Sequence, residues 1–293
     1  MDLNLELLNA IDSFVWGPPL LVLLVGTGIL LTLRLKLLQV FQLPKALGLI
    51  FKAQNKGSGD IDSFKALCTA LSATVGTGNI VGVATAIAAG GPGAIFWMWM
   101  AAFFGMATKY AEGLLAVKYR EVDSKGEIAG GPMFYIKNGM GPKFKWLGSL
   151  FAIFGVLVAY FGIGTFAQVN SIVDITKMTI GLDPMWTALI LTILVAAITL
   201  GGLQSIASAA AKIVPAMAVI YFISTIGVLV YFADKVPAAI QTIVYSAFSG
   251  SAAAGGFLGA TVMLAMRNGI ARGVFSNESG LGSAPIVAAA AKT

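Results

Sequence analysis

The sequence predicts an all-α integral membrane protein. Of its 293 residues, 58% are hydrophobic and only 11% are charged, and the mean hydropathy is +0.88. Soluble domains contain about 45–50% apolar residues, so this composition fits a lipid environment better than water. The apolar residues also gather in runs close to the roughly 20 residues that a spanning helix needs. A helix satisfies its own backbone hydrogen bonds inside the bilayer, which makes it the natural reading of such runs.

Seven apolar runs qualify as spans. In chain order they are Val15–Leu33, Phe64–Ala88, Ala94–Val117, Trp146–Val173, Met185–Leu200, Ile213–Phe232 and a segment that begins near Ala254. Basic residues gather in the loops that follow the first and third spans, as at Arg34 and Lys118. The positive-inside rule makes these loops cytoplasmic. We therefore expect a multi-pass protein of the cell membrane with its N-terminus outside, in contact with the lipid bilayer.

The composition argues against several other classes of function. The net charge of +6 follows from the cytoplasmic loops and does not indicate a nucleic acid partner. Cys68 is the only cysteine and there is no histidine, which excludes an internal disulfide and a histidine metal site. No Ser–Lys, Asp–Asp or His–Glu constellation lies at membrane depth, so we expect no enzyme, no cofactor and no metal beyond sodium.

The second span contains SATVGTGNIVGVAT, residues 72–85, in which three glycines fall within seven positions near the middle of the bilayer. Glycine disfavours a helix interior, and irregular backbone at this depth is tolerated only where it is buried or lines a cavity. We therefore predict a discontinuous helix. Its two free ends offer N–H groups to a carboxylate and carbonyl groups to a sodium ion, which suits an amino-acid zwitterion.

The same run has two alternative interpretations. Small residues at this spacing also form packing faces between membrane helices, and that interpretation stays open. The run resembles the glycine pattern of a dinucleotide site too, but a strand before it and an acidic residue about 20 positions later are required. Residues 96–102 read FWMWMAA, without an acid. A channel would need a continuous polar lining, whereas the polar residues here cluster at one depth.

Two motifs carry a resemblance to a known family. The run GGPGAIFWMWMAAFFG at 90–105 directly follows GTGNIVGVATAIAA, and RGVFSNESGLGSAPI lies at 272–286. Both resemble signatures of the alanine or glycine:cation symporter family, and the resemblance extends over 1–293 as a single transporter domain. It implies symport of alanine or glycine with sodium, or in some members with protons, by alternating access.

The resemblance also implies an architecture and a site. The architecture is a leucine-transporter-like inverted repeat, with an extra N-terminal span at 15–33, a first five-helix repeat at 64–232 and the start of a second repeat at 254–293. In this architecture the first helix of each repeat is broken. At the first break, Thr77, Gly78 and Asn79 would contact the amino acid, and the backbone of Gly76 and Thr77 would contact the cation.

Polar residues in two other spans and in the second motif complete the set of candidates. Gln168 and Asn170 lie deep in the fourth span, where polar side chains should face the bundle interior. The resemblance assigns Gln168 to the substrate site, although a structural hydrogen bond explains either residue about as well. Lys109 and Glu112 are three residues apart on the third span and can pair. We expect a structural or gating role for these two and for Glu278 of FSNESG.

The expected architecture needs about eleven helices, more than this sequence offers. We therefore expect a fragment, or a chain that works by self-association or with a complementary C-terminal half. The alternative to a working symporter is thus a non-transporting half-transporter. A neutral substrate fits a break without charged residues, but alanine and glycine differ by one methyl group, worth only about 1–3 kcal/mol in a pocket.

Overall fold

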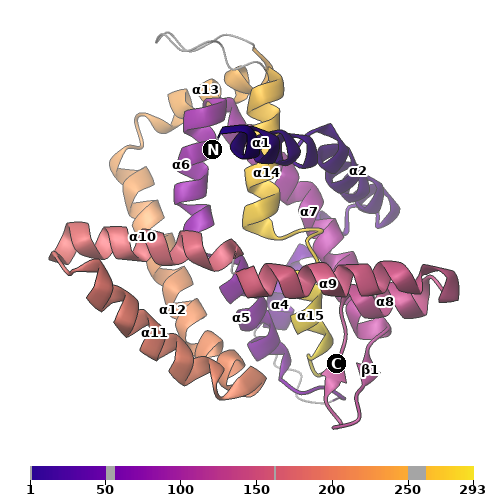
Figure 1. Ribbon diagram of the computed structural model, residues 1–293. Coiled ribbons are helices and arrows are strands. Elements are labelled where there is room, and N and C mark those ends of the chain that lie inside the picture. The colour runs from indigo at the N-terminus through magenta and orange to yellow at the C-terminus, as the bar shows by residue number, and fades with distance from the viewer. Residues whose placement is uncertain (1, 51–56, 162, 250–261) are drawn as a thin grey trace. The chain divides into compact units, whose positions relative to one another are not determined.

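The structure is a computed structural model that describes residues 2–50, 57–161, 163–249 and 262–293 (Figure 1). The chain forms two compact units, each assembled from separate segments. Unit 1 consists of Met1–Leu47, Gly78–Ala111 and Phe222–Leu281, and unit 2 consists of Gly48–Thr77, Glu112–Tyr221 and Gly282–Thr293. Each unit is described by itself.

Helices dominate both units. Those within unit 1 are α1 (Asp2–Val15), α2 (Pro18–Arg34), α3 (Leu38–Phe41), α6 (Val81–Gly90), α13 (Val236–Phe248) and α14 (Val262–Asn277). Those within unit 2 are α5 (Ser63–Thr74), α8 (Pro132–Gly139), α9 (Lys145–Phe161), α10 (Ile163–Ile180), α11 (Pro184–Thr199) and α15 (Ser283–Ala289). Helices α4 (Leu43–Ile50), α7 (Gly93–Lys118) and α12 (Gly202–Tyr231) pass from one unit to the other.

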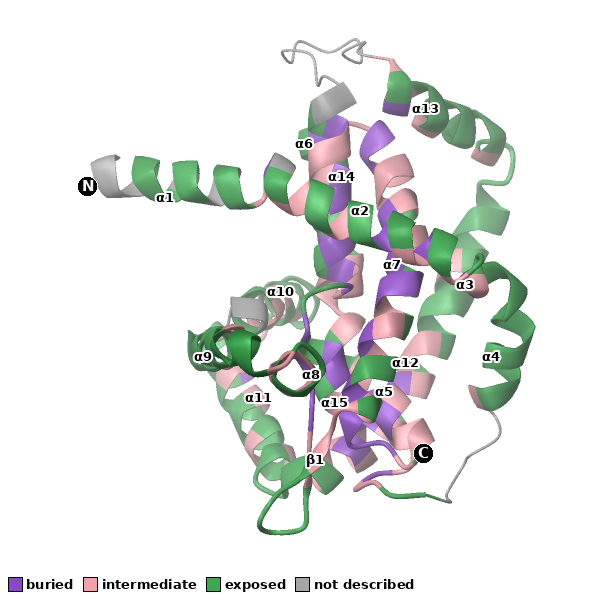
Figure 2. Ribbon diagram, turned by 90° about the vertical axis from the view of Figure 1, so that its right-hand side faces the viewer, coloured by how far each residue is buried: buried purple, intermediate pink, exposed green. Residues whose placement is uncertain are grey.

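In unit 1, α6 and α14 pack against each other in antiparallel fashion. The start of α6 meets the end of α14, because the Ser276 hydroxyl donates to the Gly78 carbonyl just before α6. The end of α6 meets the start of α14, where a Cβ on Gly90 would lie 3.1 Å from the Cβ of Asn268. Figure 2 shows buried positions along α14 and α7. Ala101 of α7 belongs with Ile270 of α14 to one buried apolar cluster.

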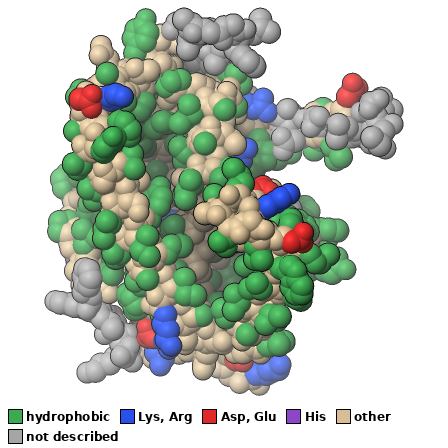
Figure 3. Space-filling model, turned by 90° about the vertical axis from the view of Figure 1, so that its left-hand side faces the viewer, with side chains coloured by type: hydrophobic (Ala, Val, Ile, Leu, Met, Phe, Trp, Pro, Cys, Tyr) green, Lys and Arg blue, Asp and Glu red, His purple; other side chains and the backbone are tan. Residues whose placement is uncertain are grey.

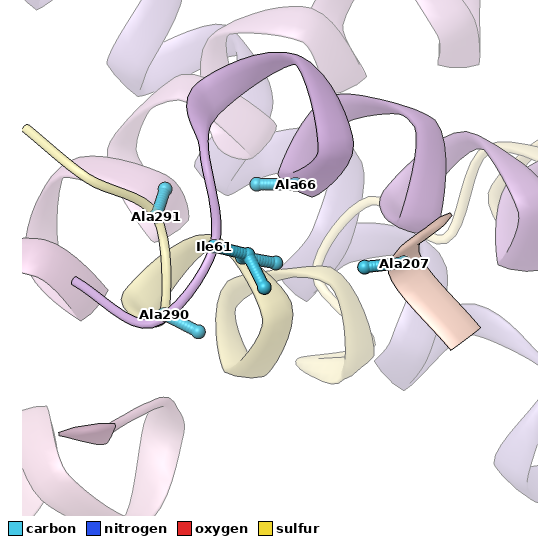
Figure 4. Packing of buried hydrophobic residues seen from close by; sticks show 5 residues of the cluster. All are labelled: Ile61, Ala66, Ala207, Ala290 and Ala291. Atoms are coloured by element: carbon cyan, nitrogen blue, oxygen red, sulfur yellow. The ribbon is translucent and has the colours of Figure 1, made fainter. Parts of the chain in front are cut away.

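In unit 2, α5 packs against α15 in the same antiparallel sense. The Ser63 hydroxyl at the start of α5 donates to the carbonyl of Lys292, beyond the end of α15, at 2.8 Å. A buried apolar cluster lies beside this contact (Figure 4), and its members are Ile61, Ala66, Ala207, Ala290 and Ala291. Small side chains dominate the cluster, which lets the backbones of these elements approach closely.

The predicted spans are found as helices, but two of their boundaries were wrong. The predicted span Trp146–Val173 corresponds to α9 and α10, on either side of residue 162, and α10 continues to Ile180. The predicted span Ile213–Phe232 begins earlier, because α12 starts at Gly202. Polar residues such as Gln204 and Lys212 interrupt the apolar pattern in that first part, whereas the small residues Ala207 and Ala210 are buried there.

Several described elements lie outside the predicted spans and were not predicted. Among them are α1, the short helices α8 and α13, and a two-stranded antiparallel hairpin of β1 (Glu121–Val122) and β2 (Ile128–Ala129). The hairpin turn is closed by the Asp123 carboxylate, which accepts the N–H groups of Lys125 and Glu127 at 2.8 and 2.9 Å. Gly126 follows with a φ of 82°, a conformation that favours glycine. This hairpin is the described exception to the all-α prediction.

Apolar side chains cover much of the exposed surface. Met178 is 84% exposed and Leu200 87%, and Figure 3 shows hydrophobic side chains spread across one face, with charged side chains in a few separate clusters. Among the described residues, the stretch 142–180 and α12 are long and apolar enough to cross a bilayer. Surfaces of this kind are covered by lipid or by other protein rather than by water. The predicted start of the last span, 254–261, lies outside the described residues.

Candidate functional site

The predicted discontinuous helix is confirmed: the second span is interrupted between α5 and α6. Helix α5 ends at Thr74, and Val75 is extended with φ −95° and ψ 108°. One turn of 3₁₀ helix, η1 (Thr77–Asn79), follows before α6 begins at Val81. The boundary of the two compact units passes through this turn, between Thr77 and Gly78. Thr77, Gly78 and Asn79 are all partly buried.

On the unit 2 side of the break, Gln168 of α10 lies directly over Gly76. A Cβ added to Gly76 would lie 3.1 Å from Oε1 and 3.2 Å from Nε2 of the Gln168 amide. Gln168 is partly buried, whereas Asn170 on the same helix is exposed and donates to the Asp174 carboxylate at 3.0 Å. The structure therefore brings one of the two predicted polar residues to the break, and the absence of a side chain at Gly76 makes room for it.

On the unit 1 side, Gly78 lies against the last turn of α14. The Ser276 hydroxyl donates to the Gly78 carbonyl at 3.2 Å, and Ser276 is only 6% exposed. A Cβ on Gly78 would be 3.6 Å from the Phe275 ring. Alanine would fit at this position, but a larger side chain would meet the ring. The Cβ direction of Gly78 therefore faces Phe275 and Ser276 of α14, which pack closely against this turn.

A second helix interruption separates α14 from α15. Helix α14 ends at Asn277, and α15 begins at Ser283. Glu278, Gly280 and Gly282 between them have φ values of 51°, 84° and 82°, so the backbone leaves the helical conformation with three left-handed residues. Positive φ is uncommon for a glutamate, and such residues mark places where the surroundings fix the backbone.

The three residues expected to be structural or gating are placed as follows. The Lys109 ammonium lies in unit 1, where it donates to the backbone carbonyl of Glu278 at 3.5 Å. Glu112 lies in unit 2 and is 8% exposed. Burial, and to a smaller extent the charge of Glu112, raise the pKa of Tyr135 to about 12. The pairing of Lys109 with Glu112 stays a prediction.

Sequence reasoning missed Ser276 as a neighbour of the first break, and it did not place the second break between α14 and α15. The sequence did contain an indication of this second break, because SNESGLG combines small polar residues with two glycines, as the first break does. What the sequence lacked was the antiparallel pairing of α6 with α14, which brings position 276 to position 78.

The two polar residues of α10 give a direct test of the site. We expect Gln168→Ala to weaken substrate binding about tenfold, as expected for the loss of one or two hydrogen bonds, and Asn170→Ala to leave it unchanged. The reason is that only Gln168 lies over Gly76. Isothermal titration of the purified protein with alanine measures both affinities. The reverse order would move the site along α10.

Comparisons of this chain with a family model and with known proteins agree on one family. The model of the sodium:alanine symporter family matches residues 1–293. An uncharacterized transporter of Haemophilus influenzae is 59% identical over 288 residues, which cover 98% of this chain and 63% of that protein. The sodium/alanine symporter AgcS of Methanococcus maripaludis is 54% identical over 292 residues, again 98% of this chain and 63% of that protein.

A third relative is more distant. The putative sodium/proton-dependent alanine carrier protein YrbD of Bacillus subtilis is 39% identical over 287 residues, which cover 98% of this chain and 57% of that protein. The chain thus spans a little under two thirds of the length of the first two relatives. These relatives are named as transporters, carriers or symporters, not as enzymes. Together with the match over all 293 residues, they show that this chain belongs to the sodium:alanine symporter family.

Proposed function

We propose that the protein is a cation-coupled symporter that carries a small neutral amino acid, alanine or glycine, together with sodium by alternating access. The observation that carries the proposal is the interrupted helix α5–η1–α6, with its glycines at positions 76 and 78. Where a helix is broken inside the membrane, its N–H and carbonyl groups are not all used within the helix, so they can bind a carboxylate and a cation without any charged side chain.

Thr77, Gly78, Asn79 and Gln168 form the substrate site in this proposal, and the backbone of Gly76 and Thr77 faces the cation. The position of Gln168 over Gly76 supports the first assignment. Residues 72–85 contain no ionisable side chain, which supports a substrate without net charge. Ser276 joins the set as the residue that holds the Gly78 carbonyl.

The inverted-repeat architecture belongs to the same proposal. Its support is that the chain contains two interrupted helices whose halves pair in antiparallel fashion, α6 with α14 in unit 1 and α5 with α15 in unit 2. The first repeat would cover 64–232, after an extra N-terminal span at 15–33. The second would begin within 254–293, and the N-terminus would lie outside the cell.

Uptake into liposomes tests the function. We expect labelled alanine to accumulate in proteoliposomes under an inward sodium gradient and to stop accumulating when choline replaces sodium, because the coupling ion drives the movement. A parallel experiment with labelled glycine compares the two substrates. Equal uptake in sodium and choline would contradict sodium coupling.

The alternative is that the 293-residue chain is a half-transporter. In that case the chain would be well folded in the same proteoliposomes but would take up no alanine by itself. Uptake would begin when a complementary C-terminal half is supplied. The relatives lend no support to self-association, and the proposal does not depend on it.

A further inference from the structure

Arg120, in the loop between α7 and β1, binds two segments of unit 2 that are far apart in the sequence. One guanidinium nitrogen donates to the carbonyls of Ala289 and Ala291 at 2.7 and 2.8 Å. The other donates to the carbonyl and the hydroxyl of Ser58 at 2.7 and 3.0 Å. The Arg120 side chain therefore joins the end of α15 to the segment that leads into α5.

The same two segments are also joined through their backbones. The N–H groups of Asp60 and Ile61 donate to the Ala290 carbonyl at 2.9 and 3.1 Å, and the Lys292 N–H donates to the Ile61 carbonyl at 2.9 Å. The Asp60 carboxylate in turn accepts the N–H of Ile128 on β2 at 2.9 Å. The start of α5, the end of α15 and the hairpin thus form one hydrogen-bonded junction within unit 2.

The residues beside Arg120 are themselves held in place. Asn138 of α8 donates to the carbonyl of Tyr119 at 3.2 Å and to the Glu121 carboxylate at 2.8 Å. The Lys137 ammonium contacts both oxygens of that carboxylate at 3.0 and 3.2 Å. The hydrogen bonds from Asn138 and then Lys137 lower the pKa of Glu121, so the carboxylate stays ionised at neutral pH. The loop therefore presents the guanidinium in a fixed position.

Arginine is the residue type that this junction requires. Its planar fork has five donors in fixed directions, whereas a lysine ammonium is a single point with three. The carbonyls at the end of a helix lack intrahelical partners and carry the negative end of the helix dipole, so a cation there is favourable. Arg120 occupies this place at α15, and Gly130 permits the approach, since a Cβ on Gly130 would collide with that of Ala289.

Helix α5 has an internal reporter of its own position. Cys68 is 2% exposed and belongs to a buried cluster with Ala210 and Val214 of α12. If the first part of α5 left α12, the thiol would become accessible. Cys68 is the only cysteine of the 293 residues.

We propose that Arg120 is a latch: its guanidinium holds the start of α5 to the end of α15, whose following residues pack with Ala207 of α12, so that α5 stays against α12, and transport depends on this junction. The role in transport rests on the proposed function. Arg120 is a positioning residue, because it acts through the two helix ends and is not assigned to the substrate site. The described hydrogen bonds of the Arg120 guanidinium run to backbone carbonyls and to the Ser58 hydroxyl, and none of them runs to an acidic side chain.

The test compares the rate at which N-ethylmaleimide modifies Cys68 in proteoliposomes, measured by mass spectrometry of the peptide that contains this residue. We expect Arg120→Ala, which removes four hydrogen bonds, to raise the rate at least about tenfold, the effect of losing a single hydrogen bond to a charged group. Arg120→Lys should give an intermediate rate. Lys125→Ala, which removes a basic side chain from the exposed hairpin turn, is the matched control and should match the wild-type protein.

Two further measurements complete the test. The thermal unfolding midpoint of each variant is determined in parallel, and the initial rate of alanine uptake is expected to fall in Arg120→Ala. An unchanged Cys68 rate in Arg120→Ala, or a rise that occurs only with global unfolding, would overturn the latch. A wild-type uptake rate in this variant would overturn its role in transport. If the wild-type protein itself takes up no alanine, the proposed function fails, while the Cys68 comparison still decides whether Arg120 holds α5.

Discussion

Asn79→Ala is expected to raise the dissociation constant for alanine roughly 10- to 100-fold, the cost of losing a hydrogen bond to a charged group. In the proposed site the Asn79 side-chain oxygen accepts the substrate ammonium, and no carboxylate lies within the run 72–85 to replace it. Folding should change little, because Asn79 lies in a single 3₁₀ turn between two helices and is only partly buried. Titration calorimetry gives the affinity, and the unfolding midpoint reports folding.

Asn170→Ala is the matched control for this experiment, since its described hydrogen bond runs to Asp174 on the same helix. Gly78→Leu should have an effect as large as that of Asn79→Ala, because a side chain longer than a methyl group would meet the Phe275 ring 3.6 Å from the Cβ position. Normal alanine affinity in Asn79→Ala would show that the site has been assigned to the wrong residues.

Gly269→Ala is expected to destabilise unit 1 strongly. A Cβ at this position would collide with the backbone carbonyl of Ala94 on α7 and would lie 2.8 Å from the Cβ of Trp97. A backbone atom cannot turn aside as a side chain can, so α14 would have to move away from α7. We expect a loss of stability at the upper end of the roughly 1–3 kcal/mol that overpacking costs.

The midpoint of thermal unfolding in detergent measures this loss, and Trp97 lies close enough to the substitution to report it by fluorescence. Gly82→Ala of α6 is the matched control, because nothing lies within 4 Å of a Cβ there. That variant should be as stable as the wild-type protein or slightly more stable, since alanine favours a helix over glycine by roughly 0.5–1 kcal/mol. Equal midpoints for the two variants would contradict the close packing of α14 on α7.

Much of the fold could be predicted from the sequence because the dominant signal, the length of the apolar runs, is local. The break at 75–80 also left a local signal, three glycines within seven positions of one span, although a helix-packing face could explain the same run. The hairpin β1–β2 and helix α13 were missed for different reasons. The hairpin strands have two residues each and show no alternation, and α13 has 13 residues, too few to be recognised as a span.

The neighbours of the break were less predictable because they depend on pairing between distant segments. The resemblance to the family singled out Gln168, because Asn170 is an equally conspicuous amide on the same helix and only the structure shows that the two face differently. Ser276 was seen only as part of a polar cluster, since its contact with Gly78 requires that α14 run antiparallel to α6. Arg120 was counted only as a positive charge of a cytoplasmic loop, and nothing in its sequence neighbourhood indicates that it binds carbonyls of residues 289 and 291.

The chemistry of the first break bears on which ion it could bind. A proton needs a group that gains and loses it near neutral pH, but the side chains of this turn and its polar neighbours Gln168 and Ser276 are amides and hydroxyls. None of these titrates in that range. A metal cation of low charge needs only oxygen atoms at suitable distances. A proton that travelled with the substrate would need a group other than these, whereas the sodium site proposed at the break needs only oxygen atoms.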